Sequence, residues 1–579
     1  MTTAAATTTA SRRSIEARSR RCAPRTYAMS RRRRIAFACL ALGLAALWVG
    51  ALGARADDAA TPWRWNGVQR IVAIGDVHGA DRELVALLTQ VGVIDAAQHW
   101  AGGATHLVSV GDLIDRGPDS KAVLDLMMRL EEEAPRAGGY VHIVLGNHEA
   151  MNLAGDDRYA SAEDDAAFAD SQNAKPAAAG QLPGQAERAA ALAPDGRYGA
   201  WLATHPVLIV INDTAFVHGG LPTVVESGDL AALNTLFRAE LLAAAQTPND
   251  ANAQAPTALL SDVGPLWYRG TARCHALIEA PRLRRVLEAL RAQRVVIGHT
   301  PTRTGRVLTR FDGAVVMIDT GMLAAVYHGH PSALVIEGGA LRVVVAGTTA
   351  AAPPEADTGG YAGEWASVDA TAAMLASAPV ASAETTQTNG TRGVVLATAN
   401  GSVAARFAAL PKDQLRHEIA AYRLDRLLQL GFVAPVADRV VDGKHGILYI
   451  PEPDWMSDRT RRERNLAHPN DCEVGADYAL MLAFDVLIGN EARSVDNLGY
   501  DRSLTELRLR NQGDAFRPST TLRNDANPPQ KLPPAFRAKL AALDARTLAA
   551  ALQNQLDSHE IKALLARRDV IVRDWPATE

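Results

Sequence analysis

The chain has 579 residues, 48% of them hydrophobic and 21% charged, with a formal net charge of −4 at pH 7. This composition excludes an intrinsically disordered chain, and the length allows two or more domains that each bury a core. The acidic balance excludes a general nucleic-acid binder, and four cysteines without a CxxC pair exclude a disulfide-rich scaffold.

The first 56 residues have the composition of an export signal. They carry eleven arginines and one acidic residue, and the charge-free run IAFACLALGLAALWVGALG follows Arg31–Arg34. This order, ending in small residues, predicts a secretory signal that starts at residue 1 or at Met29. We expect cleavage near residue 56 and a periplasmic chain with a net charge near −14. The alternative is an anchor in the inner membrane at residues 35–54, the only case in which a membrane would be a partner.

Between residues 69 and 347, apolar runs of strand length alternate with helical patterns, which is typical of a layered α/β domain. Helical spacing is seen over residues 84–91 and 123–130. A segment rich in Ala, Asp and Gln, residues 155–200, interrupts the alternation and is interpreted as a helical insertion or lid. The expected strands are 70–74, 106–110, 142–146, 207–211, 215–219, 294–298 and 314–319.

The rest of the chain predicts a second domain. Residues 348–388 are rich in Ala, Thr, Ser, Pro and Gly without a clear period, which predicts a linker. Apolar periodicity resumes at about residue 389, so we expect a mainly helical α+β accessory domain over residues 389–579.

Polar side chains follow five of the expected strands at the point where each strand ends. The segments are GDVHG, GDLIDRG, GNHE, HGG and GHT, and the GNHE segment is expected to be a loop. Because the carboxyl ends of strands in open α/β sheets form ligand sites, we expect these side chains to meet. The candidate metal ligands are Asp76, His78, Asp112, Asn147, His218 and His299.

Carboxylate, imidazole and amide ligands suit first-row divalent cations better than calcium or a thiolate-bound structural zinc. Asp112 lies between the other ligands in chain order, and a carboxylate can bridge two cations. Two such cations lower the pKa of a bridging water and hold the attacking and leaving oxygens at phosphorus. The residues therefore predict two divalent metal ions, and they leave Mn, Fe and Zn open as alternatives.

The motifs GDxHG, GDxxDRG and GNHE stand unaltered and in order, and in them the chain resembles the calcineurin-like metallophosphoesterases, in particular the phosphoprotein phosphatases. The stretches GPLWYRG (264–270) and GHTPTRTGRV (298–307) resemble the Shewanella-like protein phosphatase branch. The resemblance implies a four-layer α/β/β/α sandwich over residues 69–347.

The same resemblance implies a role for each motif residue. Asp76, His78 and Asp112 would hold the first metal, and Asp112, Asn147, His218 and His299 the second. His148 would be the general acid for the leaving alcohol, oriented by Asp115, because an imidazole can supply that proton near neutral pH. Arg116 and Arg269 would bind phosphoryl oxygens, a task that suits the planar guanidinium.

These inferences predict an exported phosphomonoesterase of the serine/threonine/tyrosine protein phosphatase type that uses a metal-activated hydroxide for in-line attack. The partner would be a phosphorylated protein or peptide. One alternative is hydrolysis of small phosphate esters or dinucleoside polyphosphates. The related dinucleoside hydrolases tend to lack the residue equivalent to Asp115. Another is a binding or signalling protein whose C-terminal module recruits partners.

Four further residues near the motifs have open roles. Asp319 either lines the site or holds a turn, whereas Glu149 is expected to be structural because the metals already supply the nucleophile. Trp267 and Tyr268 either form a wall for the substrate or belong to the core.

In the C-terminal half, the stretches at 417–435, 484–498 and 509–516 resemble atypical kinase-fold domains of the HipA and Golgi casein kinase type. By that resemblance the catalytic Asp position holds Ala492, the metal-binding Asp position holds Asn511, and Arg406 is the best substitute for the ATP lysine. A kinase without these groups lacks its base and its metal carboxylate. We therefore predict a degenerate, non-catalytic binding or regulatory module, with a plain helical accessory domain as the alternative.

Overall fold

The computed structural model describes residues 63–169, 180–246, 257, 259–349, 351–357, 368–386, 390–399, 401–452, 455–519, 529–553 and 555–578. The predicted export signal or anchor lies outside the described residues. Among the helices in these ranges, none is both long enough and apolar enough to cross a bilayer.

Two sheets form the N-terminal half, and all seven predicted strands lie in them. The first sheet has the order β11-β10-β2-β3-β4, with β2, β3 and β4 parallel. The second has the order β1-β5-β6-β7-β9-β8-β12. Their bounds are β1 (Arg64–Trp65), β2 (Arg70–Ile74), β3 (His106–Ser109), β4 (Tyr140–Ile143), β5 (Leu208–Ile211), β6 (Thr214–Val217), β7 (Arg294–Ile297), β8 (Leu308–Arg310), β9 (Val315–Met317), β10 (Ser332–Glu337), β11 (Ala340–Val345) and β12 (Glu355–Ala356).

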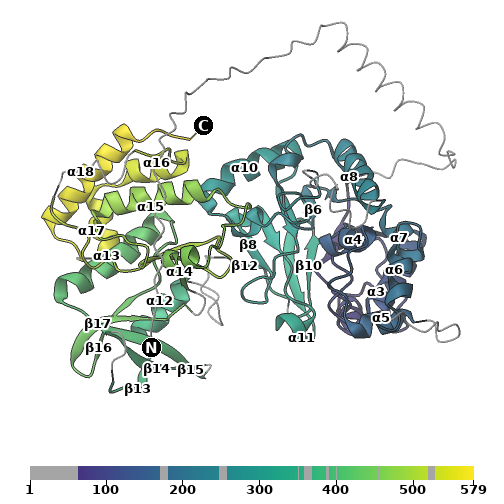
Figure 1. Ribbon diagram of the computed structural model, residues 1–579, viewed down its shortest axis with the longest axis horizontal. Coiled ribbons are helices and arrows are strands. Elements are labelled where there is room, and N and C mark those ends of the chain that lie inside the picture. The colour runs from purple at the N-terminus through teal and green to yellow at the C-terminus, as the bar shows by residue number, and fades with distance from the viewer. Residues whose placement is uncertain are drawn as a thin grey trace, which may run out of the picture. The chain divides into compact units, whose positions relative to one another are not determined.

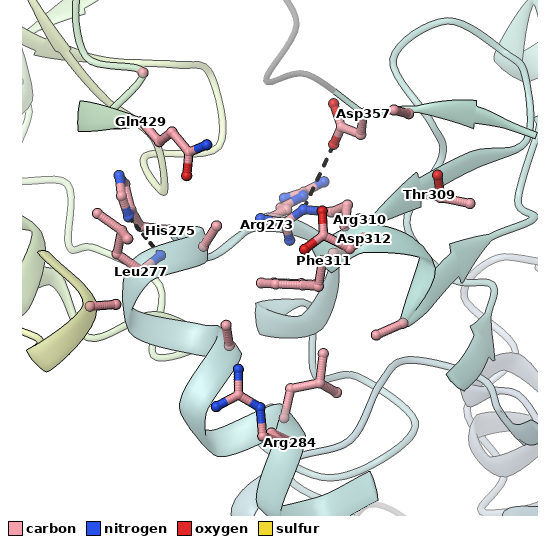
Figure 2. Close-up of a pocket in the computed structure, with 18 of the residues that line it drawn as sticks. Arg273, His275, Leu277, Arg284, Thr309, Arg310, Phe311, Asp312, Asp357 and Gln429 are labelled. Atoms are coloured by element: carbon pink, nitrogen blue, oxygen red, sulfur yellow. Dashed lines mark hydrogen bonds and ion pairs between the residues drawn. The ribbon is translucent and has the colours of Figure 1, made fainter. Parts of the chain in front are cut away.

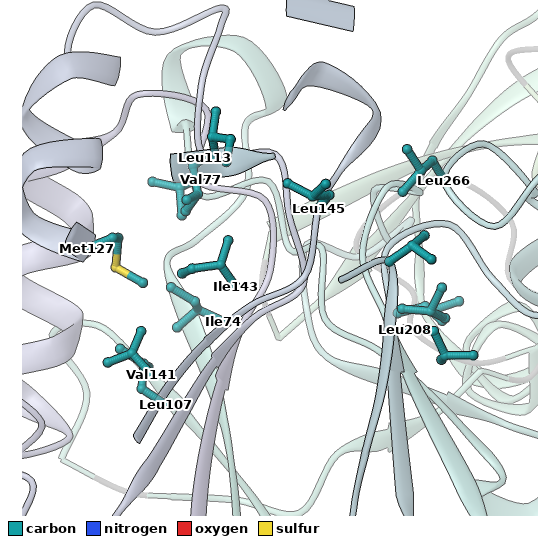
Figure 3. Close-up of a cluster of buried hydrophobic side chains, with 14 of the residues drawn as sticks. Ile74, Val77, Leu107, Leu113, Met127, Val141, Ile143, Leu145, Leu208 and Leu266 are labelled. Atoms are coloured by element: carbon teal, nitrogen blue, oxygen red, sulfur yellow. The ribbon is translucent and has the colours of Figure 1, made fainter. Parts of the chain in front are cut away.

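Alternate residues of each strand serve two different cores. Ile71 and Ala73 of β2 belong to a buried cluster that also contains Phe216 and Val296 of the other sheet, so the two sheets pack face to face. Their neighbours Val72 and Ile74 belong to the cluster that includes the helices, and Figure 3 shows Ile74 with Leu107, Val141, Ile143 and Met127. The two clusters confirm the expected layered α/β sandwich.

Helices cover the outer faces of the sheets, where they bury apolar side chains worth roughly 1.5–3 kcal/mol each. In α2, for example, Leu84, Leu87 and Leu88 are buried at helical spacing. Besides α4 to α7, which are described below, the α-helices of this half are α2 (Asp81–Gln90), α3 (Ser120–Glu133), α8 (Leu230–Ala245), α9 (Gly270–Arg273), α10 (Ala276–Ala289) and α11 (Ala324–Tyr327).

The insertion is helical, as expected, and is packed into the domain. It contains α5 (Ala162–Phe168), α6 (Gln185–Leu192) and α7 (Arg197–Leu202). Phe168, Leu192 and Leu202 are buried in the cluster shared with the sheet. In the part of the insertion that the structure describes, these helices are therefore part of the core of the domain.

The GNHE segment is not the expected loop, because it begins the helix α4 (Asn147–Leu153). Gly146 is the N-cap, and the carboxylate of Glu149 accepts the Gly146 backbone N–H at 2.7 Å. A glutamate at the third helical position satisfies a donor that the helix itself leaves unpaired, which allows the strand to turn directly into a helix.

The predicted linker at 348–388 is wrong over its second part. There α12 (Val368–Ser377) buries Met374 and Leu375, and β13 (Val380–Ala383) pairs antiparallel with β14 (Arg392–Thr398). The Ala-rich composition hides this short one-sided apolar pattern. The C-terminal sheet therefore begins before residue 389.

The C-terminal half combines a sheet with helices, drawn from green to yellow in Figure 1. Its antiparallel sheet has the order β13-β14-β15-β17-β16, and a second, small sheet has the order β18-β19-β20. Phe484, Leu487 and Leu564 lie in its main core. The further elements are β15 (Gly401–Ala409), α13 (Lys412–Leu428), β16 (Ala437–Val441), β17 (Lys444–Tyr449), β18 (Met456–Ser457), α14 (Asp458–Glu463), α15 (Val474–Ile488), β19 (Leu498–Tyr500), β20 (Leu507–Leu509), α16 (Pro534–Ala542), α17 (Ala545–Leu552) and α18 (Ser558–Asp574).

A disulfide joins the two halves, which together form one compact unit over Trp63–Glu579. It links Cys274 to Cys472, 198 residues apart in the sequence. In the chain-entropy account, a cross-link that closes so long a loop stabilises the fold by about 5 kcal/mol.

Candidate active site

The structure brings all six predicted metal ligands together, and each is buried. Asp112 lies at the centre, with its Oδ2 atom 3.8 Å from His78 Nε2 and 3.2 Å from His218 Nε2. Asn147 Oδ1 lies 3.0 Å from the same His218 nitrogen. Asp76 lies 3.9 Å from His78, and it accepts the backbone N–H of His299 at 3.0 Å. The five strand ends therefore meet in one place, as the sequence predicts.

Two overlapping groups of side chains could each hold a cation. One comprises His78, Asp112 and His148, the other Asp112, His218 and His299, and within each group the ligand atoms lie within 4.8 Å of one another. Asp112 belongs to both groups, which is the sharing expected of a bridging carboxylate. The first group includes His148 and does not include Asp76, which was expected to be its third member.

In three of the histidines, one ring nitrogen is hydrogen-bonded to a backbone carbonyl oxygen. The Nδ1 atoms of His78 and His218 lie 3.1 Å from Ile114 O and 2.8 Å from Val110 O, whereas His299 uses Nε2 toward Trp267 O at 3.1 Å. An imidazole bound in this way presents its other nitrogen to the site with its orientation fixed.

Several site residues have a left-handed backbone, which is costly for side chains other than glycine. The φ angles are 51° at His78, 55° at Asp112, 71° at Asp115, 67° at Arg116 and 63° at His299. The surrounding fold therefore holds these residues in a geometry that an isolated loop would avoid.

The charge of the site fits divalent cations. Burial, together with the nearby Asp319 and Asp112, raises the pKa of Asp76 well above its usual value, and burial raises that of Asp319 to about 6. Asp319 therefore lies beside Asp76, and it also holds a turn, because its Oδ1 atom accepts the backbone N–H of Gly321 at 3.1 Å. Buried carboxylates placed side by side repel one another unless cations lie between them, so this donor set fits two divalent metal ions.

His148 and Asp115 form a buried pair beside these ligands. His148 Nδ1 lies 2.6 Å from Asp115 Oδ2, and its Nε2 lies 3.8 Å from Asp112 Oδ2. Burial disfavours the charged imidazole, but the negative charge of Asp112 and the bond to Asp115 outweigh it and raise the pKa of His148. The contact with Asp115 therefore fixes the orientation of the ring and favours its protonated form.

The two predicted phosphate-binding arginines differ in their surroundings. The guanidinium of Arg116 lies 4.5 Å from the ring centre of Tyr159, and its buried Nε atom has no hydrogen-bond partner among the described residues. Arg269 donates from Nη1 to His299 O at 2.7 Å and to Thr300 Oγ1 at 3.1 Å. Its backbone N–H lies 3.5 Å from Asp471 Oδ1, beside the disulfide. Arg116 is thus the more available of the two.

Glu149 has the structural role expected for it. Its carboxylate accepts backbone N–H groups from Asp112 at 2.9 Å, Leu113 at 2.8 Å and Gly146 at 2.7 Å. It therefore ties the loop that carries Asp112 to the start of α4. Tyr268 is buried against Glu279 at 3.1 Å and belongs to the core, while Trp267 contributes its carbonyl to His299.

Four residues around the site carry no signal in the motifs. Tyr327 Oη lies 3.2 Å from His78 Nε2, and Tyr159 lies over Arg116. Asn152, one turn of α4 after His148, donates to Asp115 Oδ2 at 2.9 Å. Arg188 of α6 pairs with Asp115 Oδ1. Only the fold shows these contacts, because the partners lie in separate segments.

The kinase-like prediction for the C-terminal half stays a prediction. Ala492 lies in the loop after α15, where its N–H meets Asn490 Oδ1 at 3.0 Å. Asn511 follows β20 and is exposed. Arg406 on β15 lies 3.7 Å from Glu384, so its guanidinium is used in an ion pair.

A cavity of about 1060 Å³ lies away from the predicted site, beside α10 (Figure 2). None of the ten predicted site residues lines it. Arg310 and Asp357 form an ion pair of 3.8 Å at its wall. Asp477, a further lining residue, has a buried oxygen without a hydrogen-bond partner in the described part of the chain.

The sandwich of two sheets, the ligand set at the strand ends and the His148–Asp115 pair define a metallophosphoesterase. Comparison with known proteins agrees, since the model of the calcineurin-like phosphoesterase family matches residues 69–303. An uncharacterized protein of Schizosaccharomyces pombe is 30% identical over 281 residues, 46% of this chain and 76% of that protein. The chain belongs to the calcineurin-like phosphoesterase family.

Two further similarities concern proteins named as phosphatases. Shewanella-like protein phosphatase 2 of Arabidopsis thaliana is 34% identical over 187 residues, 27% of this chain and 48% of that protein. The crystal structure of a cold-active protein-tyrosine phosphatase of a psychrophilic Shewanella species is 30% identical, covers 49% of this chain and 80% of that chain, and has a TM-score of 0.42.

Proposed function

We propose that the protein is an exported, metal-dependent phosphomonoesterase that removes phosphate from phosphorylated serine, threonine or tyrosine. The observation that carries the proposal is the His148–Asp115 pair at 2.6 Å beside the predicted ligands. A protonated imidazole at that place supplies the proton that a departing alkoxide or phenoxide needs. The name of one relative, Shewanella-like protein phosphatase 2, supports the same substrate class.

The proton would move from the Nε2 atom of His148. Because Nδ1 is bound to Asp115, the free nitrogen is the one that faces Asp112 at 3.8 Å. Asp115 holds the ring in one orientation and favours its charged form. The leaving oxygen of the substrate takes the proton as the bond to phosphorus breaks, so that an alcohol leaves.

Arg116 would bind the phosphoryl group. Its buried Nε–H has no partner in the described chain, and Tyr159 supports the guanidinium plane. An anion with several oxygens satisfies such a donor, and binding gains from the low dielectric of the cleft. Arg269 would assist from the other side of the site through the nitrogens that do not bind His299 and Thr300.

The metal ions would be held by Asp76, His78 and Asp112 on one side and by Asp112, Asn147, His218 and His299 on the other. When bound, two such cations polarise a phosphoryl oxygen and lower the pKa of a water, which is the chemistry this ligand set is suited to. Manganese, iron and zinc all accept these ligand types, and we propose manganese as the first to test.

Two features support export. The order of basic, apolar and small residues in positions 1–56 is that of a secretory signal. The Cys274–Cys472 disulfide is of a kind that persists in oxidising compartments such as the periplasm. Cell fractionation, combined with the mass of the mature chain, tests both export and cleavage near residue 56.

The function is tested by hydrolysis of phosphoserine, phosphothreonine and phosphotyrosine peptides beside nucleotides, with and without added Mn²⁺. We expect metal-dependent release of phosphate from at least one peptide, and a loss of roughly 10²–10⁴-fold in His148→Asn. Turnover of nucleotides alone would replace the proposal with hydrolysis of small phosphate esters. Full peptide activity in His148→Asn would contradict the role of the imidazole.

A further inference from the structure

A buried arginine from the insertion reaches the His148–Asp115 pair. Arg188, on α6, is 1% exposed although it carries a full charge. Its Nη2 atom pairs with Asp115 Oδ1, which is the oxygen that His148 does not use. Burying a guanidinium is costly unless it is paired, so the partners of Arg188 have to offset that cost.

The other nitrogens of Arg188 hold the same group of residues. Nε donates to Asp164 Oδ2 at 2.8 Å, and Nη1 donates to Asn152 Oδ1 at 2.8 Å. Asn152 in turn donates from Nδ2 to Asp115 Oδ2 at 2.9 Å and to His148 O at 2.9 Å. Arg188 therefore fixes Asp115 directly and again through Asn152.

Asp115 has no other cation on its Oδ1 side among the described residues. Its Oδ2 atom receives His148 and Asn152, and its backbone N–H donates to Ser120 Oγ at 3.0 Å. Without Arg188, a carboxylate that is 0% exposed would keep side-chain partners on Oδ2 alone and would be free to rotate. Such a rotation weakens its hold on the imidazole.

We propose that Arg188 is a positioning residue for proton donation: it locks Asp115 so that His148 delivers its proton to the leaving oxygen. The inference rests on the proposed function and adds a task for the insertion, which supplies a charged side chain to the reaction centre. The known motifs supply His148 and Asp115, whereas Arg188 comes from a segment outside them.

The test uses the dependence of the rate on the leaving group. Phenyl phosphate releases a basic oxygen and needs the proton, whereas 2,4-dinitrophenyl phosphate releases a stable anion and does not. We expect Arg188→Met to lower kcat on phenyl phosphate by roughly 10–100-fold and to change the rate on the dinitrophenyl ester by less than about threefold. Arg188→Lys keeps the positive charge but loses the planar guanidinium with its several donors. This variant should show the same selective loss to a smaller extent.

Two reference variants distinguish a failure of the proposed function from a failure of the role proposed for Arg188. His148→Asn must itself show the selective loss, and if it does not, the proposed function fails before the role of Arg188 is judged. Arg567→Met is the matched control, because Arg567 is 2% exposed and, among the described residues, its hydrogen bonds go to backbone carbonyls of the C-terminal half. We expect it to affect both esters equally.

Equal losses on both esters in Arg188→Met, with a selective loss in His148→Asn, would overturn the inference and leave Arg188 a structural residue. If Arg188→Met does not fold, the lysine variant decides the question. A folded Arg188→Lys enzyme without selective loss would then overturn it.

Discussion

Glu149→Gln tests how the loops that carry the ligands are held. The side chain accepts three backbone N–H groups, two at Oε2 from Asp112 and Gly146 and one at Oε1 from Leu113. A glutamine of the same size has a single acceptor oxygen. In its better orientation that oxygen replaces Oε2, and its NH₂ group faces the N–H of Leu113.

The variant therefore loses at least one hydrogen bond to a charged acceptor and places two donors against each other in a buried site. A lost bond of this type costs about 1.5–3 kcal/mol, and an unsatisfied buried donor adds to that, so we expect a loss of about 2–4 kcal/mol. Because Asp112 and Asn147 flank these contacts, metal affinity or activity should also fall by roughly 10–100-fold.

The assays are thermal unfolding, phosphatase rate and metal content after dialysis. Glu418→Gln is the matched control, since Glu418 is also buried and accepts the N–H groups of Gln512 and Gly513 at 2.8 Å, in the C-terminal half. Both N–H groups bind Oε1 of Glu418, which a glutamine oxygen can replace, so Glu418→Gln should leave the metal content unchanged and lower the melting temperature less than Glu149→Gln does. Unchanged stability and metal content in Glu149→Gln would refute the reasoning.

Three further predictions concern the site and the C-terminal half. Arg116→Ala should lower kcat/KM for phosphopeptides by roughly 10–100-fold, mostly through KM, and steady-state kinetics would contradict this by showing an unchanged KM. Chelation should abolish activity and lower the melting temperature, because Asp76, Asp112 and Asp319 then repel one another without a cation, and Mn²⁺ should restore both. Burial raises the pKa of Asp477 from 3.8 to about 7, so its contribution to stability is present below pH 4 and is lost as the pH rises through 7, by up to about 4 kcal/mol. Asp477→Asn should be less sensitive between pH 5 and 8 in thermal unfolding, and an equal sensitivity would count against the burial of that charge.

The sequence predicts correctly that the candidate ligands lie together, because each stands at or just after the end of a strand. The strand pattern places Asp76, Asp112, Asn147, His218 and His299 at the carboxyl ends, and parallel pairing brings such ends together. What it misses at this point is local, since the strand at 142–146 begins two residues earlier and GNHE starts a helix. A capping glutamate three residues after a glycine is the signal that could have shown the helix.

The residues that support the centre could not be predicted in the same way. Arg188 lies 73 residues from Asp115, in an Ala-rich insertion whose packing the motifs do not specify. Likewise, two cysteines 198 residues apart give no sign of pairing, because spacing alone does not determine connectivity. Such contacts depend on how separate segments pack, and a single sequence does not encode that as a local pattern.

The left-handed backbone at His78, Asp112, Asp115, Arg116 and His299 has a consequence for protein engineering. Each such residue costs of order 1 kcal/mol, and a glycine would remove most of that strain. A screen that rewards only heat resistance would therefore favour replacements at the very positions proposed to bind metal, orient the acid or hold phosphate. Selection for stability and selection for turnover are expected to pull these positions in opposite directions, so a thermostable variant of this enzyme should be sought in the C-terminal half or at the surface.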